Sequence, residues 1–160
     1  MYCLHAKKTR ELALFFLLLA VLSGVGLRAA DHPDLTGTWN LDAAKSDFGP
    51  FPGPGSMTDH IDQQKSEIIV NRDRAGEPVV IHLPLDGSER TNELRGNAMK
   101  TTAHWDGGTL VIDYRGQQRG RPAQSEERWT VAPDGKTMKV IRQLSRPQGK
   151  MEQTLLMVRQ

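Results

Sequence analysis

A series of Asp-Gly dipeptides constrains the fold of this chain more than any other feature of its 160 residues. Asp86-Gly87, Asp106-Gly107 and Asp134-Gly135 separate short segments that are rich in Val, Ile, Thr, Trp and Tyr. Asp-Gly favours a tight turn between antiparallel strands, because glycine tolerates a positive φ and the Asp side chain bonds to its own backbone. The chain after residue 30 is therefore expected to be a succession of β-hairpins.

The segments between these turns alternate apolar and polar residues, as a strand with one buried face does. Leu110, Ile112 and Tyr114, for example, share one face. No long stretch after residue 30 has the three-to-four-residue spacing of an amphipathic helix. We predict strands over Leu35–Leu41, Met57–Gln63, Glu67–Arg72, Pro78–Leu83, Ser88–Leu94, Ala98–Trp105, Thr109–Arg115, Gln124–Val131, Thr137–Leu144 and Lys150–Arg159.

A meander of this length must pack on another sheet or close on itself to bury its dry face. Almost every connection is short, which favours closure into a barrel over a Greek-key sandwich with its long crossing loops. The predicted fold class is all-β: an antiparallel up-and-down meander closed into a barrel of eight to ten strands. Residues 31–160 are expected to form this single domain.

The connection over residues 42–56 is the long exception, and it is rich in proline and glycine. Such a segment provides neither a full ladder of N–H donors nor a stable helix, although Ala43–Asp47 has the composition for one helical turn. Phe48 and Phe51 place two apolar side chains on it. We expect a loop or lid that lies over a dry part of the barrel.

The first thirty residues have the three-part pattern of a secretory signal peptide. Lys7, Lys8 and Arg10 precede an unbroken apolar run over 12–22, and small residues follow it. The uncharged stretch is shorter than the ~20 residues that span a bilayer, so cleavage after Gly26, Ala29 or Ala30 is favoured over an uncleaved anchor. We therefore predict export, to a periplasm or out of the cell, and no membrane span after cleavage.

Cysteine and charge exclude several classes of function for the chain after residue 30. The one cysteine, Cys3, lies in the leader, so the exported part has no disulfide, thiolate metal site or thiol nucleophile. The formal charge of +2 also comes from the leader, and the rest is nearly balanced. A nucleic-acid partner is not expected, because a phosphate-binding domain carries a basic excess.

Several large side chains fall on the apolar face of the predicted strands and are candidates to line a ligand cavity. A barrel of this size is either filled by its side chains or keeps room for one small ligand, so a packed core is the competing interpretation. The candidates are Trp105, Tyr114, Trp129, Met138 and Val140 on the strands, with Phe48 and Phe51 on the long loop.

Three histidines, His60, His82 and His104, recur at a spacing of 22 residues, which could bring them to similar heights on alternate strands. Three imidazoles around one axis suit zinc with an open fourth position. Each histidine, however, is next to a residue of the apolar face, so alternation directs it outward, where the three would not converge. A metal site is the weaker interpretation, and no cofactor is expected.

Glu127 is the carboxylate with most scope for chemistry, because it shares a face with Trp129. Pointing inward, it would be a desolvated acid, available as a general acid or as an anchor for a cationic ligand. The favoured interpretation is an outward carboxylate paired with Arg121 or Arg128, since surface pairs of this kind are common. No catalytic motif or phosphate-binding glycine loop is present, so enzyme activity is not indicated.

Gly37-Thr38-Trp39 at the start of the first strand, followed by a long loop, resembles the G-x-W motif of lipocalins. The wider pattern, Gly-Thr-Trp-x-Leu-Asp-x-x-Lys-Ser-x-Phe-Gly and later Trp-Asp-Gly-x-x-Leu-Val-Ile, looks like a group of small exported bacterial lipocalin-like proteins of unknown role. The resemblance implies a barrel whose narrow end is closed by Gly37 and Trp39, with the guanidinium of Arg159 on the indole ring.

These features predict an exported barrel that binds a small apolar or amphiphilic molecule. The alternative is a filled barrel that serves as a structural or interaction module of the cell envelope. A metal-dependent or acid-catalysed enzyme is the third and least favoured interpretation.

Overall fold

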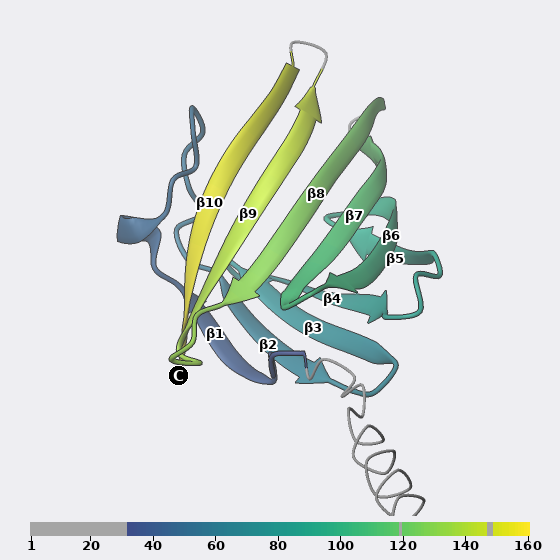
Figure 1. Ribbon diagram of the computed structural model, residues 1–160. Helices are drawn as coiled ribbons and strands as arrows, with labels where there is room; N and C mark the ends of the chain where they lie inside the picture. The colour runs from purple at the N-terminus through teal and green to yellow at the C-terminus, as the bar shows by residue number, and fades with distance from the viewer. Residues whose placement is uncertain (1–31, 119, 147–148) are drawn as a thin grey trace, which may run out of the picture. The chain divides into compact units, whose positions relative to one another are not determined.

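The computed structural model describes residues 32–118, 120–146 and 149–160, which form ten antiparallel strands and one short helical turn (Figure 1). The predicted signal peptide lies outside the described residues. The elements are β1 (Gly37–Leu41), η1 (Ala43–Lys45), β2 (Thr58–Gln63), β3 (Glu67–Arg74), β4 (Glu77–Pro84), β5 (Arg90–Leu94), β6 (Asn97–Asp106), β7 (Thr109–Gln118), β8 (Arg121–Val131), β9 (Thr137–Arg146) and β10 (Gly149–Arg159).

The strands form one sheet in which sequence neighbours pair and β1 also pairs with β10, in the order β4-β3-β2-β1-β10-β9-β8-β7-β6-β5. Trp39 pairs with Arg159, and Leu41 with Met157, so the two ends of the meander meet. This arrangement confirms the all-β up-and-down barrel and places the strand number at the upper end of the predicted range. Each predicted strand matches an observed one. The turns at Asp106-Gly107 and Asp134-Gly135 form hairpins as expected, whereas Asp86-Gly87 joins β4 to β5, which share no backbone ladder.

Alternation along the strands separates a buried interior from a solvated exterior. The interior residues near the end of the barrel that holds the β6–β7 and β8–β9 turns are large, apolar and almost completely buried. Burial of each such side chain stabilises the fold by roughly 1.5–3 kcal/mol. This filled part of the core includes Ile68, Leu83, Leu110, Ile112, Trp129, Met138, Val140 and Met157.

Trp39 closes this end of the barrel. Its side chain is fully buried, and its indole N–H donates to the backbone oxygen of Leu35 over 2.8 Å. The guanidinium of Arg159 lies 4.5 Å from the ring centroid, which is the contact that the G-x-W resemblance implied. A cation over an indole contributes about 0.5–2 kcal/mol, depending on its desolvation.

The barrel is nearly closed, because no backbone ladder joins β4 to β5. A side chain joins them instead. Asn92, buried on β5, accepts a hydrogen bond from the backbone N–H of His82 over 2.8 Å and donates its amide to the His82 oxygen over 2.9 Å. We call this gap between β4 and β5 the seam. One side-chain amide thus satisfies both backbone groups of a residue at its edge.

Replacing Asn92 with Ala is expected to lower the free energy of unfolding by about 1–3 kcal/mol, because both backbone groups of His82 lose their partner. The His82 amide should also exchange with solvent faster. Urea denaturation and amide hydrogen exchange measure the two effects. Thr91→Ala, an exposed substitution on the same strand, is the control. Equal stability of the two variants would show that Asn92 does not hold β4 and β5 together.

The proline- and glycine-rich connection runs along β10 beyond the end of β1. Its helical turn, η1, confirms the turn expected at its start. Asp47 then forms an antiparallel bridge with Thr154, and the backbone oxygen of Phe48 accepts a hydrogen bond from the Gln153 amide over 2.9 Å. The Phe48 ring packs against the core. The connection therefore completes the wall next to β10.

Candidate functional site

The other half of the barrel is hollow and contains a cavity of about 1870 Å³. Residues of the β3–β4, β5–β6 and β7–β8 hairpins, among them Glu77, Arg95 and Gln118, lie around its mouth. Ligand pockets of roughly 300–1,000 Å³ hold drug-sized molecules, so the volume is ample for a small ligand.

Apolar side chains from four strands form much of the cavity wall. They include Val79 of β4, Leu94 of β5, Met99 of β6 and Leu144 of β9, with Phe51 contributed by the long connection. Such a surface favours the apolar part of a ligand, because contact with it removes the ligand from water.

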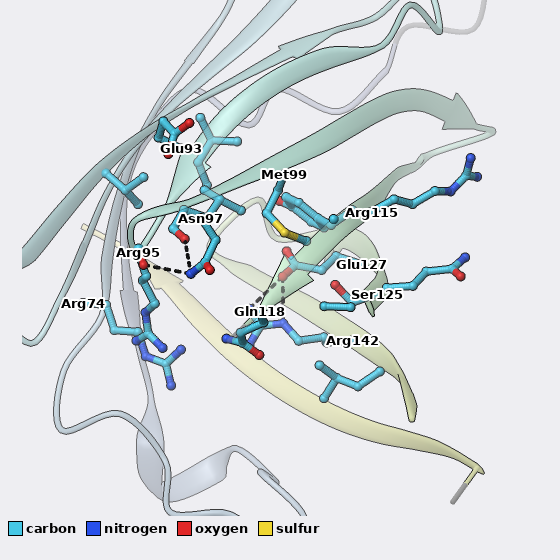
Figure 2. Close-up of a pocket in the computed structure, with 18 of the residues that line it drawn as sticks. Arg74, Glu93, Arg95, Asn97, Met99, Arg115, Gln118, Ser125, Glu127 and Arg142 are labelled. Atoms are coloured by element: carbon cyan, nitrogen blue, oxygen red, sulfur yellow. Dashed lines mark hydrogen bonds and ion pairs between the residues drawn. The ribbon is translucent and has the colours of Figure 1, made fainter. Parts of the chain in front are cut away.

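A buried ion pair lies where the hollow half meets the filled half. Glu127 of β8 accepts a hydrogen bond from Arg142 Nε over 2.7 Å (Figure 2). It accepts a second one from the indole N–H of Trp129 over 2.9 Å. Glu127 and Arg142 are directly opposite each other on β8 and β9. Only 4% of the Glu127 side chain and 14% of the Arg142 side chain are exposed, so neither charge is compensated by water.

A second buried ion pair joins the neighbouring strands β2 and β3. Arg72 of β3 donates Nε and Nη2 to the two carboxylate oxygens of Asp59, each over 2.8 Å. Its guanidinium lies 5.8 Å from the centroid of the Trp129 ring. This two-point geometry is the stronger form of an arginine–carboxylate contact.

The prediction that Glu127 points outward was wrong. Desolvation alone would raise the pKa of Glu127, but the charges of Arg142 and Arg72, with the hydrogen bonds from Trp129 and Arg142, hold it below its ordinary value. Arg128 pairs instead with Asp106 on the surface, over 2.6 Å. The signal available in the sequence was the Asp134-Gly135 turn, because aligning β8 with β9 through it places Arg142 opposite Glu127.

Tyr114 contributes a hydroxyl group to the cavity wall. The side chain is only 4% exposed, and its oxygen has no hydrogen-bond partner among the described residues. Burial, followed by the charge of Glu127, raises the pKa of this phenol, so it stays neutral at ordinary pH. A buried hydroxyl without a partner costs free energy, which a polar ligand atom or a water molecule in the cavity would recover.

Arg74, the last residue of β3, is half-buried and lies among other arginines. Burial, then the charges of Arg95, Arg142 and Arg72, lowers its pKa to about 10. Figure 2 shows the side chains of Arg74 and Arg95 next to each other at one side of the cavity. The site is therefore apolar along its walls and locally cationic.

The structure divides the predicted cavity residues between the two halves of the barrel. Tyr114 and Phe51 line the cavity. Trp129, Met138 and Val140 are buried in the filled core, and Phe48 packs against that core. Trp105 stacks on the ring of His32, with the ring centroids 4.5 Å apart. The apolar pattern identified the interior correctly, but it did not show which interior positions face empty space.

The three histidines lie on different strands with different partners. His60 is 2.9 Å from the Thr38 hydroxyl, and His82 is 3.1 Å from a carboxylate oxygen of Glu67. His104 is exposed. Within the part of the chain that the structure describes, no group of three or more His, Cys, Asp or Glu side chains is placed to hold a metal ion.

Among residues 32–118, 120–146 and 149–160, no helix has the length and apolar character that crossing a bilayer requires.

Comparison with known proteins places the fold. No protein-family model matches the chain, and no curated protein sequence matches it. Solved structures do. The REP1-NXSQ fatty acid transporter superposes with a TM-score of 0.61 at 19% identity, over 79% of this chain and 96% of its own. The barrel has a lipocalin-like, fatty-acid-binding-like fold.

Two further solved structures agree with this fold. The zebrafish ileal bile acid-binding protein in complex with cholic acid has a TM-score of 0.60 at 14% identity, over 78% of this chain and 98% of that one. A secretory abundant heat soluble protein from Ramazzottius varieornatus has a TM-score of 0.63 at 11% identity, over 79% of this chain and 95% of its own. Sequence identities this low show a common fold but not a common ligand or function.

Proposed function

We propose that this chain is an exported binding protein that holds a small apolar or amphiphilic molecule in the hollow half of its barrel. The observation that carries the proposal is the cavity of about 1870 Å³, with apolar walls, in a barrel whose other half is densely filled. A filled-barrel interaction module would need no such space. The two buried carboxylates, Glu127 and Asp59, are each paired with an arginine, as suits binding more than acid catalysis.

The similar structures support the same class of ligand. One is named as a fatty acid transporter, and another was solved with cholic acid, which is an amphiphile with a large apolar surface. Support for export comes from the amino-terminal pattern of basic head, apolar run and small residues.

Ligand binding is tested by titrating the purified protein with a fluorescent fatty-acid analogue, for which we expect saturable binding. Val79→Trp should weaken it at least tenfold, because Val79 lines the cavity and the larger ring occupies ligand space. Val80→Trp is the matched control, since the adjacent side chain is 48% exposed and outside the cavity lining. Absence of saturable binding to the unmodified protein would refute the proposed function.

Export is tested by expressing the complete chain in a bacterial host, fractionating the cells and sequencing the amino terminus of the recovered protein. We expect a protein outside the cytoplasm that begins after Gly26, Ala29 or Ala30. An intact amino terminus in the cytoplasmic fraction would contradict this part of the proposal.

A further inference from the structure

We propose that the ligand carries an anionic group, and that this group binds between Arg74 and Arg95, across the seam between β4 and β5. The inference rests on the proposed function, because it names the chemical class of the molecule in the same cavity. It rests on four observations: an unpaired guanidinium, the local sum of charge, the backbone of Arg95 and the place of the two residues beside the seam.

Three cavity arginines, Arg74, Arg115 and Arg121, have no carboxylate at ion-pair distance among the described residues, and of these only Arg74 is half-buried. Arg72 and Arg142 are each bound to a buried carboxylate at 2.7–2.8 Å. Arg95 has only a long contact, 3.7 Å from Nε to a carboxylate oxygen of Glu77, whose side chain is 70% exposed. Arg74, half-buried next to Arg95, is opposite Glu77 in the β3–β4 ladder and is influenced by its charge, but among the described residues no ion pair joins the two side chains.

The sum of charges around Arg74 is positive. Arg72, Arg74 and Arg142 face the two buried carboxylates of Asp59 and Glu127, which leaves one guanidinium uncompensated. Adding the pair of Arg95 and Glu77 does not change this balance. Glu93 also lines the cavity and offsets one positive charge, but Arg115 and Arg121 of the same lining add two, so the sum over the cavity stays positive. The Arg95 side chain is 48% exposed, but Arg74 is half-buried, and two adjacent cations of which one is partly withdrawn from water attract an anion.

The backbone of Arg95 is in a conformation that this residue type rarely adopts. Arg95 has a φ of 54° and precedes Gly96, with a φ of 70°, at the tight turn between β5 and β6. Asn, Asp or Gly usually occupies the first of these positions, because a longer side chain is strained there. The Asn97 amide donates to the backbone oxygen of Arg95 over 2.9 Å and stabilises the turn. The strained turn presents a guanidinium beside Arg74.

The two arginines stand on opposite sides of the open seam. Arg74 belongs to the β3–β4 hairpin and Arg95 to the β5–β6 hairpin, which share no backbone ladder. Polar contacts between these hairpins include the Asn92–His82 hydrogen bonds and, nearer the mouth, the long Glu77–Arg95 ion pair. An anion bound to both guanidinium groups would connect the hairpins at the mouth of the cavity.

Carboxylate, phosphate and sulfonate groups each present two oxygen atoms that a guanidinium fork can bind at two points. The anion can therefore be the head group of an amphiphile or a free inorganic ion. The apolar wall next to the arginines, formed by Val79 and Leu94, favours a head group whose tail enters the cavity.

The test compares dodecanoate with dodecanol, which has the same tail but no charge, on the unmodified protein and on Arg74→Gln and Arg95→Gln. We expect dodecanoate to bind roughly tenfold to a hundredfold more tightly than dodecanol, and this preference to fall to severalfold or less in each variant. Dodecanol affinity should be unchanged, which shows that the variants are folded. Arg90→Gln, an exposed change on β5, should keep the full preference.

Equal affinity of the unmodified protein for dodecanoate and dodecanol would overturn the inference while leaving the proposed function intact. Failure of both to bind would refute the proposed function itself, and the head-group assignment with it. Inorganic phosphate is the third probe. Saturable phosphate binding that disappears in Arg74→Gln, without any preference for dodecanoate, would assign the site to a free ion and overturn the head-group proposal.

Discussion

Replacing Glu127 with Gln is expected to lower the free energy of unfolding by about 3–5 kcal/mol. The substitution leaves the buried Arg142 guanidinium without its counter-charge, and an uncompensated charge in the interior costs that much. Urea denaturation followed by tryptophan fluorescence measures the change. Glu126→Gln is the matched control: the neighbouring carboxylate is on the surface, 3.6 Å from Arg128, and its loss should cost no more than about 1 kcal/mol.

The same variant should respond differently to acid. Because the folded protein lowers the pKa of Glu127, its ionised form contributes stability that is complete above the ordinary glutamate pKa of about 4.3. That contribution is lost as the pH falls through the lower folded value. Below about pH 4 the unmodified protein should therefore lose stability more steeply than Glu127→Gln. Parallel curves of unfolding free energy against pH would show that Glu127 is not held ionised by the fold.

Replacing Trp39 with Ala is expected to lower the free energy of unfolding by about 3–5 kcal/mol. The indole is fully buried, and truncation leaves a cavity and removes the ring on which Arg159 lies. Trp39→Phe keeps an aromatic ring but deprives the Leu35 oxygen of its donor, so we expect a smaller loss of about 1–3 kcal/mol. Thermal and urea denaturation test both values. A change below 1 kcal/mol for Trp39→Ala would show that the indole does not hold this end of the barrel.

The hairpins could be read from the sequence because turn chemistry is local. An Asp-Gly dipeptide favours a turn through the preferences of its own two residues, so the turns at Asp86, Asp106 and Asp134 follow from the sequence, although the first joins β4 to β5, which form no hairpin. The seam could not be predicted in this way. Asn92 stands inside an alternating strand, and its role depends on the His82 backbone, which lies across a gap that only the closed sheet creates.

The candidate site could likewise be predicted from the sequence only in part. Alternation placed Trp129 and Tyr114 inside the barrel, and both are buried. It contains no information on height along the barrel axis, so it did not separate Trp129 in the filled core from Tyr114 at the cavity. Small residues such as Gly116, Ala123 and Ser125 line the hollow half. Most of the large apolar residues that were predicted to line the cavity occupy the filled half instead.

Period-two polarity and turn residues, both properties of neighbouring amino acids, were sufficient for the positions of the strands and for the face of each that carries the large apolar side chains. The depth of the cavity, the pairing of Glu127 with Arg142 and the meeting of Arg74 with Arg95 depend on contacts between residues distant in the chain. Those contacts exist only once β1 has paired with β10 and the sheet has curved into a barrel, because that closure determines which inward groups face one another.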